Sequence, residues 1–495
     1  MESPVFSSAQ MQAAEQAAFS RGVSVETLMD QAGTGVARAV RQFFPKPATC
    51  IVFAGKGHNG GDTLVAAEQL QRIGWKIDLR LPFSEETCSE LTQKKLKALR
   101  DATEPPETID RARHSIILDG LLGTGAKSFL REPIRTAARE INRLRREENG
   151  FVFAVDLPTG LDADSGEHDP EDSVIADVTT TIGFAKHGLI VDSALNFVGR
   201  IDVVPLPGLW SETSAPNELV STPSALSALL PRRGFDAYKN EFGRIGVVAG
   251  SKGLLGAALL ATHGALRAGA GLVRVYVPEE IYEIVASAAP IESMVHPVRK
   301  YRDLLEESVD VWALGPGLGK ARAAEVLNLI ENASQPMIID ADGLNILAEK
   351  IAVLPNCRGP RLLTPHPGEM KRLMDVGKMA RAGIARNFCD KYPVTLLFKG
   401  SRSIICERGK PINYNTTGNP GMASGGMGDV LTGVCAGLAG RGLSMFDAGR
   451  VGAWACGRAA EISIFQRGAS EESLVATDVI ANLGEAFNEL RTPSV

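Results

Sequence analysis

The chain has 495 residues, more than the roughly 250–300 that one hydrophobic core usually serves, so we expect two domains. Its net charge of −5, with no long run of Lys or Arg, argues against a nucleic-acid partner. The seven cysteines include no C-x-x-C pair, which argues against a disulfide framework or a zinc site. No signal-like N-terminus or 18-residue apolar run is present, so we expect a cytoplasmic protein without a membrane partner.

The first half of the chain alternates helical and strand patterns. Residues 8–44 have helical spacing, with a Gly-rich break expected at 32–35, and 63–72 predict a further helix. Short apolar runs bounded by Gly, Pro or Asp predict strands at 50–54, 76–81, 115–119 and 151–156. This repetition predicts a Rossmann-like, three-layer α/β domain over residues 1–210.

Five prolines between 205 and 231, among Ser, Thr and Gly, predict a domain boundary, which we place at residues 211–235. A second α/β alternation then fills 236–495. Its strands are expected at 244–249, 272–277, 309–314, 337–340 and 394–398, and its helices at 256–267, 428–438 and 448–465. The fold class is therefore two α/β domains in one chain.

Three polar turns follow predicted strands of the first domain. Ala54-Gly-Lys-Gly-His-Asn-Gly-Gly-Asp62 joins a strand to a helix, and its glycines allow a ligand close to the backbone. Asp119-Gly-Leu-Leu-Gly-Thr-Gly125 and Asp156-Leu-Pro-Thr-Gly160 follow two more strands. A single turn of this kind can be purely structural. Three at the carboxyl edge of one parallel sheet predict a ligand cleft.

These turns, with Gly183-Phe-Ala-Lys186, resemble the YjeF N-terminal domain, the NAD(P)H-hydrate epimerase family, over residues 8–208. The resemblance implies K⁺ ligands at Asn59, Asp119 and Thr159 and a catalytic Asp156 that touches the reacting ring. It also implies substrate contacts at His58, Asn59, Gly60, Gly61, Asp62, Gly123, Thr124, Gly125, Ala126, Lys127, Ser128 and Phe129.

Three positions of this first match keep alternatives open. The family usually has Asn where this chain has His58, which is either a hydrogen-bonded turn residue or a titrating group. The family usually has Ser where this chain has Thr159, a mild change if the backbone carbonyl is the ligand. Lys186 either supplies positive charge near Asp156 or is a surface lysine.

A Gly-rich stretch, Asn415-Thr-Thr-Gly-Asn-Pro-Gly-Met-Ala-Ser-Gly-Gly-Met-Gly-Asp429, precedes an apolar helix in the second domain. Free N–H groups at Gly425, Gly426 and Gly428, backed by the helix dipole, suit an anion. Asp429 fits a base that accepts a proton from a hydroxyl attacking a phosphoryl group. Its alternative interpretation is a helix cap.

This turn resembles the ribokinase-like superfamily, and the segments around it narrow the resemblance to the YjeF C-terminal domain, the ADP-dependent NAD(P)H-hydrate dehydratase. The segments are Gly250-Ser-Lys-Gly-Leu-Leu-Gly-Ala257, Arg267-Ala-Gly-Ala-Gly-Leu-Val273, Gly315-Pro-Gly-Leu-Gly319, Asp340-Ala-Asp-Gly343, Leu363-Thr-Pro-His-Pro-Gly-Glu369 and Phe398-Lys-Gly400. The match spans residues 220–490.

The second resemblance implies hydrate contacts at Ala257, Gly317, His366 and Asp429. It implies adenine-nucleotide contacts at Lys399, Gly400, Ser401, Arg402, Ser403 and Gly428. Asp340 and Asp342 are interpreted as turn caps rather than as electrostatic help near Mg²⁺, and Glu369 is the candidate on the Mg²⁺ side.

Together the two resemblances imply repair of NADHX and NADPHX, the hydrated nicotinamide dinucleotides. They imply that the first domain interconverts the R and S hydrates with K⁺ bound. They imply that the second domain dehydrates the S form with Mg²⁺ and a phosphoryl donor, for which the resemblance favours ADP while the sequence leaves ADP and ATP open. The resemblance further implies a homo-oligomer. The alternative is a vitamin-precursor kinase fused to a non-catalytic nucleotide-binding scaffold, which shares the Gly-x-Gly-Asp turn but leaves the first domain unexplained.

Overall fold

The computed structural model describes residues 2–103, 115–125, 129–210 and 216–492, which form two compact units. The N-terminal unit spans Ser3–Pro216, and the C-terminal unit begins at Asn217 and includes Glu2. Part of the segment 211–235, which we expected to be a linker, belongs to the C-terminal unit. Its residues Glu218–Val220 form strand β9, which pairs in parallel with β18 (Ile412–Tyr414) of that unit.

The N-terminal unit is built on a parallel sheet with strand order β3-β2-β4-β5-β6-β8. These strands are β2 (Thr49–Ala54), β3 (Lys76–Arg80), β4 (Ile116–Gly120), β5 (Phe151–Val155), β6 (Val178–Ile182) and β8 (Arg200–Val204). A short parallel pair, β1 (Ser3–Phe6) with β7 (Ala185–Lys186), adds to this unit. All the strand carboxyl ends of the parallel sheet meet at one edge, as the sequence predicts.

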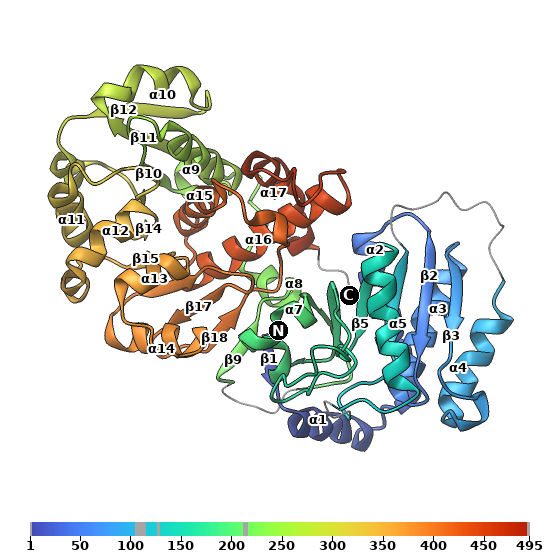
Figure 1. Cartoon of the computed structure of the whole chain (residues 1–495). Helices are drawn as coiled ribbons and strands as arrows, with labels where there is room; N and C mark the ends of the chain where they lie inside the picture. The colour runs from blue at the N-terminus through green and yellow to red at the C-terminus, as the bar shows by residue number, and fades with distance from the viewer. Residues whose placement is uncertain (1, 104–114, 126–128, 211–215, 493–495) are drawn as a thin grey trace. The chain divides into compact units, whose positions relative to one another are not determined.

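Helices α1 (Ser8–Ser20), α2 (Val25–Phe43), α3 (His58–Arg72), α4 (Glu90–Asp101) and α5 (Ile134–Glu147) belong to the N-terminal unit, with short helices α6 (His187–Ile190) and α7 (Leu195–Val198). Figure 1 shows them in blue to green around the sheet. The break expected at 32–35 is wrong. The chain breaks at 21–24, where Gly22 has a φ of +89° and Ser24 caps α2.

Gly33 and Gly35 lie inside α2 for a packing reason. A Cβ atom on Gly33 would lie 2.4 Å from Cβ of Val65 in α3, and one on Gly35 would lie 2.1 Å from Cγ1 of Val204 in β8. Both distances are far below van der Waals contact. These glycines therefore let α2 approach its neighbours closely instead of ending the helix.

The C-terminal unit has a mixed sheet with strand order β12-β11-β10-β13-β14-β15-β16-β17-β18-β9. Its strands up to β16 run parallel, and β17 (Ile404–Glu407) is antiparallel to both of its neighbours. The parallel strands are β10 (Arg244–Val248), β11 (Leu272–Pro278), β12 (Ser293–Val298), β13 (Val311–Leu314), β14 (Met337–Ile339), β15 (Arg361–Leu363) and β16 (Thr395–Phe398).

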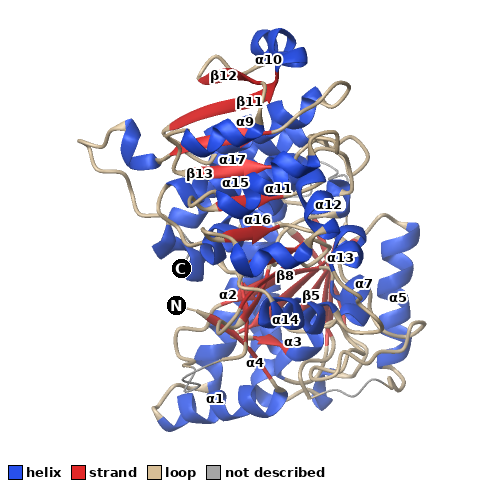
Figure 2. Cartoon of the chain, turned by 90° about the vertical axis from the view of Figure 1, so that its left-hand side faces the viewer, coloured by secondary structure: helices blue, strands red, loops and turns tan. Residues whose placement is uncertain are grey.

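Helices cover this sheet, as Figure 2 shows. Helices α9 (Leu255–Arg267), α15 (Met427–Gly440), α16 (Met445–Phe465) and α17 (Ala476–Arg491) pack on one another and share one apolar core with the strands. Further helices are α8 (Pro223–Leu226), α10 (Tyr282–Ala288), α11 (Ala323–Asn332), α12 (Asp342–Glu349), α13 (Pro367–Leu373) and α14 (Arg381–Lys391). The sheet's carboxyl edge thus presents the starts of α9, α12, α13 and α15.

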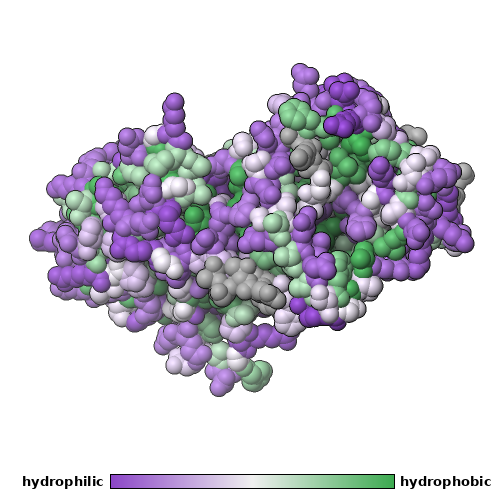
Figure 3. All heavy atoms as spheres, turned by 90° about the horizontal axis from the view of Figure 1, so that it is seen from below, coloured by the Kyte–Doolittle hydropathy of each residue, from purple (hydrophilic) through white to green (hydrophobic). Residues whose placement is uncertain are grey.

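The face seen in Figure 3 is mostly hydrophilic, with apolar residues in small separate groups. Within the described ranges, no helix combines the length and apolarity needed to cross a bilayer.

Candidate active sites

Asp119 is the penultimate residue of β4 and is completely buried at the carboxyl edge of the N-terminal sheet. Its carboxylate accepts hydrogen bonds from the Thr159 backbone N–H at 2.8 Å, the Thr159 hydroxyl at 2.7 Å and the Leu121 N–H at 3.3 Å. Burial raises the pKa of Asp119 to about 6, against the lowering effect of these bonds. Asp119 and Thr159, two of the three expected K⁺ ligands, are therefore in direct contact.

Asn59, the third expected ligand, lies in the first turn of α3. Its Nδ2 donates to the Leu122 carbonyl at 2.9 Å, and Leu122 in turn donates its N–H to the Thr159 hydroxyl at 3.2 Å. The Asn59 Oδ1 is buried and has no hydrogen-bond partner in the described structure. A buried oxygen without a donor is a feature that a cation can satisfy, so these residues fit a K⁺ ion.

Asp156 follows β5 with a φ of +70°, a strained conformation for a residue with a side chain. Its Oδ1 accepts hydrogen bonds from the ammonium of Lys186 and from the Ile182 N–H. Its Oδ2 faces Gly123, where a Cβ atom would lie 3.4 Å from that oxygen and 3.4 Å from Cγ of Asn59. The three expected turns therefore converge, with one oxygen of Asp156 left facing the Gly-rich turn.

Lys186 is fully buried, so its interpretation as a surface lysine is wrong. Besides Asp156, its ammonium donates to the Ile182 carbonyl at 2.9 Å and to the Thr181 hydroxyl at 3.1 Å. An ammonium has three donors, and all three are used inside the unit. Lys186 therefore fixes the orientation of Asp156 and balances its charge.

Glu15 is a site residue that no motif predicted. It is half-buried on α1, on the same face as the buried Met11 and Ala18. Burial raises its pKa, and the charge of Asp156 raises it further. The pKa of Asp62 in α3 is raised well above its usual value by burial, and then by the charges of Asp156 and Glu15. The signal for Glu15 in the sequence was a carboxylic acid on the apolar face of a helix.

The remaining expected substrate contacts of this unit are spread around the cleft. Gly60 and Gly61 are buried in the first turn of α3, and a Cβ on Gly60 would lie 1.9 Å from the Gly55 carbonyl oxygen. His58 and Gly125 are exposed, Thr124 is half-buried, and Phe129 is 83% exposed. The predictions for Ala126, Lys127 and Ser128 lie outside the described residues.

In the C-terminal unit, the Gly-rich stretch leads into α15. Gly426, with a φ of +89°, is its N-cap, and Gly428 and Asp429 lie in its first turn. The N–H groups of a first helical turn have no acceptor within the helix, so the first turn of α15 can offer donors to an anion. Burial and the neighbouring Asp340 charge raise the pKa of Asp429 to about 6. A carboxylate with that pKa is a competent base near neutral pH.

Asp340 and Lys399 form a buried ion pair beside this turn. Lys399 Nζ donates to Asp340 Oδ1 at 2.7 Å, and the Thr432 hydroxyl of α15 donates to Oδ2 at 2.9 Å. A Cβ on Gly428 would lie 3.2 Å from both Asp340 Oδ2 and Lys399 Nζ. The interpretation of Asp340 as a turn cap is therefore wrong, because its oxygens are committed to Lys399 and Thr432. Asp340 lies between β14 and α12, and its ion pair with Lys399 holds that lysine beside Gly428.

Asp342 behaves as a turn cap, as expected. Its Oδ2 accepts the Gly319 N–H at 2.8 Å and its Oδ1 accepts from Asn345. Gly317 of the same turn, with a φ of +62°, lies against α9, since a Cβ there would be 3.0 Å from Cβ of Ala257. Ala257 and Gly317, two expected hydrate contacts, are therefore neighbours.

His366 and Glu369 begin α13 as a reciprocal cap. The Gly368 N–H donates to Nδ1 of His366 at 3.0 Å, and the His366 N–H donates to Glu369 Oε2 at 2.8 Å. The His366 side chain is 51% exposed, whereas that of Glu369 is 6% exposed and lies 3.9 Å from Lys399 Nζ. His366 thus has a capping role in addition to reaching the sheet edge.

The expected nucleotide residues from Lys399 to Ser403 form the turn between β16 and β17. Arg381 donates to the Phe398 carbonyl there, and Arg402 is buried. Gly400 and Ser401 are exposed, and the Ser403 hydroxyl donates to the Gly400 carbonyl. In the described ranges, no three His, Cys, Asp or Glu residues gather as a metal cage.

Comparison with known proteins assigns the chain to a family. A family model described as NAD(P)H-hydrate dehydratase matches residues 245–482, and the YjeF-related protein N-terminus matches 25–188. The Bifunctional NAD(P)H-hydrate repair enzyme Nnr of Moorella thermoacetica is 35% identical, covering 92% of this chain and 90% of that protein. The chain belongs to the bifunctional NAD(P)H-hydrate repair enzyme family.

Other members of this family match along the same length. The Nnr enzyme of Escherichia coli strain K12 is 33% identical over 94% of this chain and 90% of that protein. A solved ADP/ATP-dependent NAD(P)H-hydrate dehydratase of Bacillus subtilis, co-crystallised with ATP and Mg²⁺, is 27% identical with a TM-score of 0.47, covering 56% of this chain and 99% of that one. The two resemblances seen in the sequence are thus confirmed as one repair-enzyme family.

Proposed function

We propose that the chain repairs hydrated NADH and NADPH, with epimerisation in the N-terminal unit and nucleotide-dependent dehydration in the C-terminal unit. Family membership supports this for the whole chain. The observation that carries it is the pairing of two separate carboxylate sites, Asp156 with Lys186 and Asp429 with Asp340 and Lys399. Each lies at the carboxyl edge of its own sheet.

In the N-terminal unit, Asp156 moves the proton. Its Oδ1 is occupied by Lys186 and the Ile182 N–H, which leaves Oδ2 facing Gly123 as the reactive oxygen. Epimerising the hydroxyl-bearing carbon beside the ring nitrogen requires a proton acceptor and donor. Residues 58–62 and 123–125 hold the dinucleotide.

K⁺ in this unit would be held by Asn59, Asp119 and Thr159. The unpartnered Asn59 Oδ1 and the buried Asp119 carboxylate support this set. A bound monovalent cation would supply positive charge to the phosphates of the dinucleotide. The residues themselves fix the turn at 121–123 against α3.

In the C-terminal unit, Asp429 accepts the proton of the ring hydroxyl while the hydroxyl oxygen attacks the terminal phosphoryl group of ADP. The new O–P bond forms as the bond to the AMP leaving group breaks. Elimination of phosphate, with loss of a proton from the neighbouring ring carbon to solvent, then restores the ring double bond, since phosphate leaves more readily than hydroxide. Lys399 and the N–H groups of the first turn of α15 stabilise the phosphoryl charge.

Mg²⁺ in this unit would be held on the Glu369 side, together with phosphate oxygens, and would supply further charge neutralisation there. The buried carboxylate of Glu369, 3.9 Å from Lys399 Nζ, supports this place. ADP as donor, a cytoplasmic location and a homo-oligomer remain part of the proposal.

The test is incubation of the full chain with mixed R and S NADH hydrates, Mg²⁺ and either ADP or ATP, followed by absorbance at 340 nm. We expect complete recovery of NADH, and faster recovery with ADP. Asp156→Asn should stop recovery once the S form is consumed, and Asp429→Asn should stop recovery while epimer exchange continues. A stable phosphorylated product without recovery would instead indicate a small-molecule kinase. Epimer exchange at the wild-type rate in Asp156→Asn would indicate a scaffold domain.

A further inference from the structure

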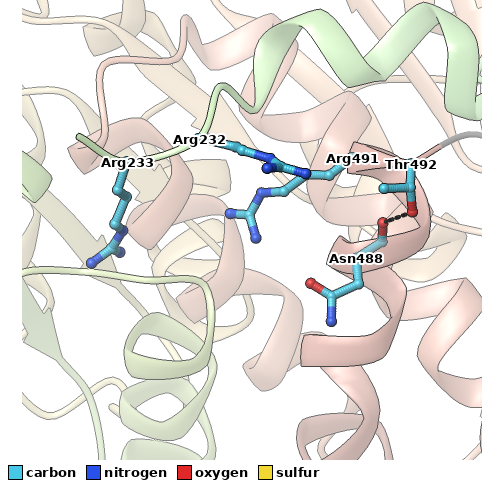
Figure 4. A pocket seen from close by; sticks show the side chains of 5 residues that line it. All are labelled: Arg232, Arg233, Asn488, Arg491 and Thr492. Carbon is cyan, nitrogen blue, oxygen red and sulfur yellow. Dashed lines mark hydrogen bonds between the residues drawn. The ribbon is translucent and has the colours of Figure 1, made fainter. Parts of the chain in front are cut away.

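Arginines gather in the C-terminal unit at a place that the two catalytic sites do not use. A pocket of about 470 Å³ is lined by Arg232, Arg233, Asn488, Arg491 and Thr492, which we call the arginine pocket. Figure 4 shows Arg232 and Arg233 entering from the segment before β10, and Arg491, Asn488 and Thr492 from the end of α17. Arg232 is exposed and Arg491 is half-buried.

A fourth arginine, Arg441, stands beside the pocket at the end of α15. A Cβ atom on Gly269 would lie 2.6 Å from Nη2 of Arg233 and 3.6 Å from Cδ of Arg441, so both side chains flank this glycine. The pKa of Arg441 is lowered by burial and then by the charges of Arg233 and Arg491. The arginines are therefore close enough to repel one another.

Carboxylates do not neutralise this group. In the described part of the chain, none of the four arginines forms a salt bridge, and Nε of Arg491 is buried without an acceptor. By contrast, the buried Arg458 on α16 is paired with both Glu461 and Glu489. A buried N–H of a charged group without a partner is costly, so Nε of Arg491 would gain from an acceptor in the pocket.

Helix ends offset only part of the charge. Arg233 donates to the Gly269 carbonyl at 2.8 Å just after α9, Arg441 caps α15, and Arg491 ends α17. Arginines at helix C-termini are favourable, since each end carries roughly half a negative charge. The helix ends stabilise these cations without cancelling their charge, and no carboxylate of the described residues does so.

The arginine pocket is far from the phosphoryl-transfer turn. Asp429 lies in the first turn of α15, whereas Arg441 follows its last residue, Gly440. At 1.5 Å per residue, these two ends of α15 are about 18 Å apart. A ligand of the pocket would therefore leave the turn at Gly428 free.

We propose that the arginine pocket is a second anion site that binds a diphosphate group, free or as part of a nucleoside diphosphate. A diphosphate group is strongly negative, opposite in sign to the arginines that line the pocket. Guanidinium groups donate in pairs to phosphate oxygens, and the Asn488 amide and Thr492 hydroxyl provide further polar contacts at the rim. This inference goes beyond the proposed repair activity and does not depend on it.

The test is calorimetric titration of the full chain with inorganic diphosphate, and separately with ADP, at fixed ionic strength. The wild type should bind diphosphate at the pocket in addition to the substrate sites of the two units. Arg232→Gln/Arg491→Gln should lose the pocket site, or weaken it at least tenfold, for both ligands, and should leave the other sites unchanged. Arg358→Gln/Arg302→Gln removes the same charge from exposed arginines elsewhere in this unit and should keep the pocket site.

Arg232→Gln alone guards against a folding defect, because Arg232 is exposed, and its thermal midpoint without ligand should equal that of the wild type. It should weaken the pocket site severalfold. Equal diphosphate binding in the pocket variants, their charge-matched control and the wild type would overturn the proposal. Loss for ADP but not for diphosphate would also overturn it, since the shared diphosphate group would then not be the ligand. The 340 nm repair assay, run in parallel, tests the proposed function separately and should be unchanged in these variants.

Discussion

Lys399 donates a 2.7 Å hydrogen bond to Asp340, and this pair joins the sheet edge to the first turn of α15. The side chains are 19% and 2% exposed. Removing one member of a buried pair leaves the other charge uncompensated, at a cost of about 3–5 kcal/mol. We therefore expect Lys399→Met to lower the free energy of unfolding of the C-terminal unit by about this amount in urea denaturation. Lys410→Met, which removes a more exposed lysine paired with Glu407, should cost at most about 1 kcal/mol.

The same pair predicts a pH dependence. Burial opposes ionisation of Asp340, but the charge and hydrogen bond of Lys399 lower its pKa overall. A lowered pKa gives stability that is present above the unfolded value, about 3.9, and is lost as pH falls through the folded value. The stability advantage of the wild type over Asp340→Asn should therefore be full at pH 6 and shrink below about pH 4. A difference that stayed constant from pH 7 to pH 3 would contradict this assignment of the pair.

Asp429 makes the dehydratase activity depend on pH. Its pKa is raised to about 6 by burial and by Asp340, and only the ionised form can accept the proton of the substrate. The kcat/KM for the S hydrate should therefore fall about tenfold per pH unit below pH 6. Asp429→Asn should reduce kcat by about 10²–10⁴. Epimer exchange, measured in the same variant, is the control and should remain at the wild-type rate.

The sequence predicted the sheets and the turns at the strand ends, because apolar runs and the Gly and Asp residues that follow them are local signals. It could not predict which partner each polar group takes. Asp340 was interpreted as a turn cap, yet its partners Lys399 and Thr432 are 59 and 92 residues away. Lys186 is buried because β7 pairs with β1, a contact over about 180 residues. Glu15 joins the site only because α1 packs beside Gly183, near Met11.

The contact between Lys186 and Asp156 can be measured by a double-mutant cycle. Lys186→Met leaves a buried carboxylate without its cation and should destabilise the N-terminal unit by about 3–5 kcal/mol. Asp156→Asn/Lys186→Met should be more stable than Lys186→Met alone, because the uncompensated charge is gone. A double variant whose loss equals the sum of the single losses would contradict a direct pair. Epimer exchange should be lost in all three variants, since each disturbs the base.

K⁺ should stabilise the N-terminal unit through Asn59, whose Oδ1 is buried and unpartnered. A ligand that binds only the folded state stabilises it by about 2.7 kcal/mol at one hundred times its Kd. Replacing KCl by choline chloride at equal ionic strength should therefore lower the thermal midpoint of the wild type. Asn59→Ala should lose this difference, whereas Asn196→Ala, which changes an exposed asparagine in α7, should keep it. An identical salt response in Asn59→Ala and the wild type would mean that Asn59 holds no cation. The epimerase rate, measured in the same two salts, should follow the midpoint, because Asn59 and Asp156 both lie beside Gly123.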